Sequence, residues 1–108
     1  MNAKTKLELK SDESLLLGNC IVGVSKFCDD ETKEEIDSIV KYLVYRGGKP
    51  YSFFTLKQLY VCWSCINAHL KDKILLYKDE DNMKLGKIAI SIGEILDAPQ
   101  EVKWREFT

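Results

Sequence analysis

The clearest pattern in the sequence is an apolar face that repeats every three or four positions within residues 32–46. The residues on that face are Ile36, Ile39, Val40, Leu43 and Val44. Thr32 and Glu35 match a capping box, in which a hydroxyl and a carboxylate accept the first free N–H groups of a helix. Arg46 followed by Gly-Gly-x-Pro is typical of a helix end. These signals predict one amphipathic helix over residues 32–46.

The following segment is more apolar and predicts a second helix over residues 52–71. Its start is indicated either by Ser52 or by another capping box, Thr55-Leu-Lys-Gln58. Apolar and aromatic residues cover most of its circumference: Phe53, Phe54, Leu56, Leu59, Tyr60, Val61, Trp63, Ile66 and Leu70. A helix with such a thin polar strip must be covered on most sides. We therefore expect it at the centre of the core.

Residues 74–91 suggest a β-hairpin. A short run of branched and aromatic side chains is followed by a polar turn at residues 78–82. Beyond the turn, Ile88, Ile90 and Ile92 alternate with polar or small residues, as in a half-buried strand. We expect two short antiparallel strands here.

The two ends of the chain are less regular. A capping box over residues 91–94 predicts a short helix that stops near Pro99, and residues 102–107 form a candidate extended end. Residues 12–28 fit either a strand or a helix, because their apolar residues occur at helical spacing but include two glycines. Ser11-Asp-Glu-Ser14 favours a helix start, so a helix is the preferred interpretation.

Together these elements predict an α+β fold, predominantly helical, in a single domain over residues 1–108 with a small β-hairpin. A chain of 108 residues, 45% hydrophobic and 31% charged, is long enough for one modest core. Its apolar runs are well short of the roughly 20 residues that span a bilayer, and its charged N-terminus does not resemble a signal peptide. We therefore expect a cytoplasmic or nuclear protein that has no membrane partner.

The overall charge argues against nucleic acid as a partner. Sixteen basic and 17 acidic residues leave a net charge of -1, so no positive field attracts a phosphate backbone. The four cysteines then fit reduced, buried thiols better than a disulfide framework.

Several segments carry a family resemblance. They are Ile39-Val-Lys-Tyr-Leu43, Phe54-Thr-Leu-Lys-Gln58, Trp63-Ser-Cys-Ile66 with Leu70 and Asp72, and Ile92-Gly-Glu-Ile-Leu-Asp-Ala-Pro99. In this order they resemble the SWIB family and its divergent relative, the N-terminal peptide-binding domain of the double-minute ubiquitin ligases. The resemblance implies a hydrophobic groove that accepts one face of an amphipathic peptide helix. It places Tyr60, Trp63, Ser64 and Asn67 on the groove side, with Asn67 where the family carries an aliphatic residue.

The pair Cys62 and Cys65 invites a redox or a metal interpretation. A redox C-x-x-C pair lies at a helix N-terminus, where the dipole lowers the thiol pKa, whereas this pair lies in the middle of a predicted helix. With His69 it also forms one helical face that could ligate zinc, using Cys20 or Cys28 as a fourth ligand. Buried packing thiols explain the same pattern more simply. We therefore expect no metal, no cofactor and no catalytic residue.

These observations favour a non-enzymatic protein that binds another protein or an amphipathic peptide. One alternative is a small inhibitor or immunity-type protein that presents an acidic surface to a basic partner. That surface would comprise residues 29–37 and 79–81, with Asp79 and Asp81 as its candidate binding residues in the second range. A second alternative is a winged-helix DNA-binding regulator whose wing is the hairpin over residues 74–91. Its wing tip would be acidic, which disfavours contact with phosphate. The oligomeric state does not follow from the sequence.

Overall fold

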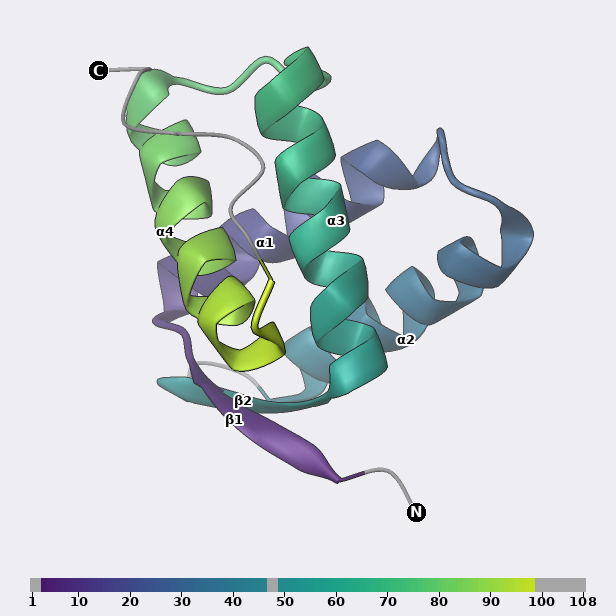
Figure 1. Ribbon diagram of the computed structural model, residues 1–108, viewed down its shortest axis with the longest axis vertical. Coiled ribbons are helices and arrows are strands. Elements are labelled where there is room, and N and C mark those ends of the chain that lie inside the picture. The colour runs from purple at the N-terminus through teal and green to yellow at the C-terminus, as the bar shows by residue number, and fades with distance from the viewer. Residues whose placement is uncertain (1–2, 47–48, 99–108) are drawn as a thin grey trace.

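The computed structural model describes residues 3–46 and 49–98, which form four helices and a two-stranded antiparallel sheet (Figure 1). In chain order the elements are β1 (Lys4–Glu8), α1 (Ser11–Ser25), α2 (Asp30–Arg46), β2 (Tyr51–Thr55), α3 (Leu56–Asp72) and α4 (Asp79–Leu96). This architecture confirms the predicted α+β, mainly helical single domain. It also confirms the helical interpretation over residues 12–25, whereas residues 26–28 form a turn after the helix. The expected turn at Gly47 and Gly48 lies outside the described residues.

Helix α3 is the central element, as its composition predicts. It contacts α1, α2, α4 and β2, and in Figure 1 it lies beside α4, in front of α1 and α2 and above the sheet. The largest completely buried apolar side chains gather around it: Phe54, Leu9, Leu17, Ile21, Ile36, Ile39, Leu59, Ile66, Leu85 and Ile92. Within the described residues, no helix is long and apolar enough to cross a membrane.

The start of α2 differs from the prediction by two residues. The helix begins at Asp30, and the carboxylate of Asp29 accepts a hydrogen bond from the backbone N–H of Thr32 at 2.8 Å. Asp29 therefore caps this helix, in the position that the sequence pattern gives to Thr32. Hydrogen bonding to Thr32 lowers the pKa of Asp29 below its usual value, because it stabilises the charged carboxylate.

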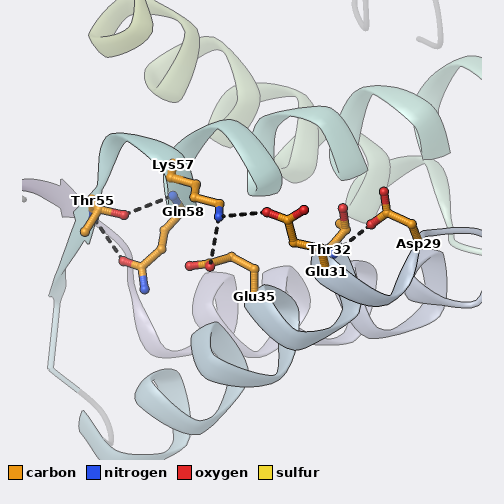
Figure 2. A network of polar contacts seen from close by, with 7 residues as sticks. All are labelled: Asp29, Glu31, Thr32, Glu35, Thr55, Lys57 and Gln58. Carbon is orange, nitrogen blue, oxygen red and sulfur yellow. Dashed lines mark hydrogen bonds and ion pairs between the residues drawn. The ribbon is translucent and has the colours of Figure 1, made fainter.

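The start of α3 is also shifted, since residues 51–55 form a strand instead of the first turn of a helix. The second capping box is the correct one. Thr55 Oγ1 accepts the N–H of Gln58 at 3.1 Å, and the Gln58 side chain accepts the N–H of Thr55 at 2.9 Å (Figure 2). In β2, buried Ser52 and Phe54 alternate with the exposed Phe53, which is a strand period of two.

The partner of β2 is far away in the sequence. Leu7 of β1 pairs with Ser52, and Thr5 pairs with Phe54, in an antiparallel register. The outer edge of β2 is partly covered, because the N–H of Phe53 donates to the hydroxyl of Tyr42 at 2.8 Å. Neither strand can be recognised from its own sequence, because each is only five residues long and is stabilised by pairing with the other.

The predicted hairpin over residues 74–91 is wrong. Residues 73–78 form a connection, and α4 then runs without interruption, so the short helix expected from residue 91 is its last part. The buried residues Leu85, Ile88, Ala89 and Ile92 follow helical spacing, and they pack on α3 and α1. The isoleucine alternation was misleading because Ile88 and Ile92 are also one helical turn apart. Helix α4 ends at Leu96; Pro99 and residues 102–107 lie outside the described residues.

The capping box of α3 generates a stability prediction. Thr55→Ala removes the acceptor for the N–H of Gln58 and should lower the free energy of unfolding by about 1 kcal/mol. Ser38→Ala is the control, because Ser38 is exposed in the middle of α2 and its loss should change stability by less than about 0.5 kcal/mol. Urea unfolding followed by circular dichroism measures both. Equal midpoints for the two variants would contradict the role assigned to Thr55.

Candidate functional site

An apolar groove of about 360 Å³ lies between the end of α1, the start of α2 and one side of α3. Its lining residues are Val24, Phe27, Cys28, Thr32, Tyr60, Val61, Ser64, Cys65, Ala68, Asp72 and Ile74. We call this surface the Tyr60 groove. Four segments of the chain contribute to it, because Ile74 from the connection before α4 closes one end.

Two aromatic side chains flank the groove and remain accessible. Phe27 is 73% exposed and Tyr60 is 58% exposed, while Val24, Val61 and Cys65 form a buried floor. Large apolar side chains that stay exposed next to a hollow are typical of a surface that contacts a partner. The groove therefore offers both a receptive floor and aromatic anchors.

The four positions suggested by the family resemblance divide between two sides of α3. Tyr60 and Ser64 line the groove, one helical turn apart. Trp63 is only 6% exposed, and its indole nitrogen would lie 3.4 Å from a Cβ at Gly93 of α4. Asn67 is completely buried, and its side-chain amide donates to the carbonyl of Trp63 at 3.0 Å. The expectation that all four face one groove is therefore corrected: Trp63 and Asn67 are buried, and Trp63 lies against Gly93 of α4.

The Tyr60 groove also draws on residues to which the sequence pattern gives other roles. Phe27 has the helical spacing of a core residue, but it follows the last turn of α1 and is exposed. The pattern places Ile74 in a strand and Thr32 at a helix cap. Only the packing of α1, α2, α3 and the connection before α4 brings these three residues to one surface.

The acidic residues do not form one surface. Asp79 and Asp81 lie in the first turn of α4, where negative charge stabilises the positive end of the helix dipole. In Figure 1 the start of α4 and the start of α2 lie on opposite sides of α3. The acidic clusters at residues 29–37 and 79–81 are therefore separate features, and only the first adjoins the Tyr60 groove, through Thr32.

The cluster at the start of α2 is held against the start of α3. The ammonium group of Lys57 lies 3.4 Å from Glu31 and 3.9 Å from Glu35 (Figure 2). Because Lys57 and Glu31 are largely solvated, their pair contributes little stability, and the pair with the less exposed Glu35 is longer. Residues 29–37 contain six acidic residues and one lysine, so the surface stays negative beside Lys57.

The cysteines gather in the core between α1 and α3. Cys20, Cys62 and Cys65 are buried and Cys28 is half-buried, which confirms the expectation of packing thiols. Burial raises the pKa of Cys20 and of Cys65 to about 12, and it also raises the pKa of Cys62. Neighbouring thiols add to each shift. The thiolate is the reactive form of cysteine, so this environment disfavours redox exchange. Among the described residues, no group of three or more potential ligands is arranged for a metal.

His69 has a structural role at the end of α3. Its Nδ1 accepts the backbone N–H of Leu75 at 3.1 Å, so the proton must reside on Nε2, which donates to Oδ1 of Asn82 at 2.8 Å. The ring also packs edge-on against Tyr77 at 5.3 Å between centroids. Both ring nitrogens are thus engaged, and His69 ties the connection before α4 to α3.

Comparison of the chain with protein-family models, curated proteins and solved structures gives no match. The likeness to the SWIB family therefore rests on the residues that carry it, and the function has to be argued from the Tyr60 groove.

The bonds of His69 generate a prediction about stability. His69→Leu leaves the N–H of Leu75 and the side chain of Asn82 without their partner, and it should reduce the free energy of unfolding by about 1–3 kcal/mol. Tyr77→Phe keeps the edge contact with the ring and should cost less than about 0.5 kcal/mol. Denaturant midpoints provide the measurement. A His69→Leu variant as stable as the parent would show that these bonds contribute nothing.

Proposed function

We propose that this protein is a non-enzymatic interaction module that binds one face of an amphipathic helix of a partner protein in the Tyr60 groove. The observation that carries the proposal is the pair of exposed aromatic side chains, Phe27 and Tyr60, on either side of a buried apolar floor. This is the helix-in-groove mode of recognition. The resemblance to the SWIB family implies the same mode.

The length of the groove supports a helical ligand. Its α3 wall extends from Tyr60 to Asp72, which corresponds to about 18 Å at 1.5 Å per residue. Apolar anchors at positions i, i+3, i+4 and i+7 of a ligand helix span about 10 Å and would fit along it. The lining contains few polar residues: besides two thiols, they are Thr32, Ser64 and Asp72. A small-molecule site would have several polar groups that converge on one point, and the Tyr60 groove does not resemble such a site.

The charges around the groove favour a basic partner. Asp72 belongs to its lining, and Thr32 connects it to the negative cluster over residues 29–37. Lysine or arginine flanking the apolar face of a ligand would therefore accelerate association and select the partner. The acidic surface of the inhibitor-type alternative thus becomes one rim of the same site.

A winged-helix function is not proposed. Its wing would be a hairpin over residues 74–91, and those residues form a connection and most of α4. The net charge of -1 gives no further support to nucleic-acid binding.

The first test concerns the aromatic anchors. The probe is a fluorescein-labelled synthetic helix with leucines at i, i+3, i+4 and i+7 and lysines at its flanks, measured by fluorescence anisotropy. We expect Phe27→Ala and Tyr60→Ala each to raise the Kd for this peptide by about tenfold to a hundredfold, which is the range expected for anchor residues. Leu76→Ala is the matched control, since Leu76 is fully exposed and lies outside the groove. Binding that survives both aromatic substitutions, or that a scrambled peptide reproduces, would contradict the proposal.

The second test concerns the charge of the rim. Asp72→Lys should weaken binding of the lysine-flanked helix by roughly threefold to tenfold and strengthen binding of a glutamate-flanked version, because it reverses a charge at the groove. Added salt should reduce the difference between the two peptides. Asp79→Lys is the control, since Asp79 lies at the start of α4 on another side of α3. Equal effects of the two substitutions would exclude a local contribution of Asp72.

A further inference from the structure

A polar pocket of about 520 Å³ lies where β1 leads into α1, and it shares no lining residue with the Tyr60 groove. Pockets that bind small molecules usually measure about 300–1,000 Å³. Its polar lining residues come from β1 and the connection after it, from α1, from β2 and from α4: Lys6, Glu8, Lys10, Glu13, Tyr51 and Ser91. We call this surface the Tyr51 pocket.

The end of the sheet forms one wall of the Tyr51 pocket. In the antiparallel register Glu8 pairs with Tyr51, and Lys6, two residues before Glu8, stands on the same face of β1. The ammonium group of Lys6 lies 4.9 Å from the centre of the Tyr51 ring. Beyond these pairs, the N–H of Leu9 donates to the carbonyl of Pro50 at 2.9 Å and keeps the two segments together. The pairing thus brings a cation, a carboxylate and a phenol to one place.

Helices α1 and α4 complete the pocket. A carboxylate oxygen of Glu13 accepts the backbone N–H of Lys10 at 2.8 Å, which is half of a capping box at the start of α1. This bond holds Glu13 at the pocket. Ser91 adds a hydroxyl group from α4. Polar groups therefore converge from several elements, which is the property of a small-molecule site that the Tyr60 groove does not have.

The charged groups of the pocket are of both signs and are not paired with each other. Lys6 and Lys10 supply two ammonium groups, and Glu8 and Glu13 supply two carboxylates. The ion pairs formed within residues 3–46 and 49–98 involve none of these four side chains. Their charges can therefore be paired by a ligand.

This balance of charge selects the chemical class of the ligand. The carboxylates of Glu8 and Glu13 would repel a nucleotide or another polyanion, and the two lysines would repel a polyamine. A molecule that carries one ammonium group and one carboxylate pairs with both kinds of side chain. The Tyr51 ring and Pro50 add apolar surface for the rest of such a molecule.

We propose that the Tyr51 pocket binds a small zwitterion. The ammonium group of the ligand pairs with Glu8 and Glu13, its carboxylate pairs with Lys6 and Lys10, and its apolar part contacts Tyr51. A free amino acid and a short peptide both carry this chemistry, and the pocket is large enough for either. The protein then has a small-molecule site that is separate from its helix-binding groove.

The experiment is an NMR titration of the full isotope-labelled chain with L-phenylalanine or with the dipeptide glycyl-phenylalanine, up to about 20 mM. We expect saturable shifts of the backbone amides of Glu8, Lys10 and Tyr51, with a Kd of about 1 mM or below for the tighter ligand. That ligand identifies the source of the zwitterion. Hydrocinnamate lacks the ammonium group and phenethylamine lacks the carboxylate, so each should bind at least about tenfold more weakly.

Two charge-neutralising variants test the assigned pairs. Glu8→Gln should raise the Kd for the zwitterion by about threefold to tenfold and reduce its preference over hydrocinnamate. Lys6→Gln should have a similar effect on the Kd and reduce the preference over phenethylamine. Both side chains are exposed, so the fold should be retained. Glu34→Gln and Lys33→Gln are the matched controls, because these residues are exposed on α2 outside the pocket, and they should change the Kd by less than about twofold.

Tyr60→Ala separates this proposal from the one on the Tyr60 groove, since it should weaken the amphipathic helix and leave zwitterion binding unchanged. Three outcomes would overturn the zwitterion site. The first is the absence of saturable shifts with both zwitterions. The second is equally tight binding of hydrocinnamate or phenethylamine, because one charge would then suffice. The third is a Kd that Glu8→Gln and Lys6→Gln both leave unchanged.

Discussion

The burial of α3 by the elements around it is the constraint on which the rest of the structure depends. Its side chains are so apolar that α1, α2, β2 and α4 all pack against it. Trp63 and Asn67 are buried, whereas the side with Tyr60 and Ser64 remains open. The location of the candidate site is therefore a consequence of core formation, because the groove is the part of α3 that its neighbours do not cover.

A few polar contacts fix the segments that surround this core. The guanidinium group of Arg46, although buried, donates to the hydroxyl of Ser14 and to the carbonyl of Lys49, so it joins α2 to α1 and to the segment before β2. His69 fixes the connection that contributes Ile74 to the Tyr60 groove. Such contacts satisfy buried donors and acceptors that would otherwise destabilise the fold. The bond from His69 to Leu75 also holds the neighbouring Ile74 beside α3, at the Tyr60 groove.

The charge around the Tyr60 groove adds to its apolar floor. The groove contains Asp72 and adjoins the acidic start of α2 through Thr32. Apolar contact supplies affinity, and charge decides which surface can approach. This charge is the reason for assigning a basic helix to the groove.

Local patterns in the sequence determined most of the helical structure. The period of α2, its end at Arg46 and the Thr55 capping box follow from interactions between neighbouring residues, and the apolar composition of α3 predicts its central position. The tertiary structure decided what depends on distant residues. Strand β2 exists because β1 pairs with it, and Ile88 and Ile92 lie on one buried face of a helix because α3 and α1 offer them a surface. The Tyr60 groove belongs to this second group. Sequence spacing identified Tyr60 and Ser64, but only the packing of α1 beside α3 brings Phe27 to the same hollow.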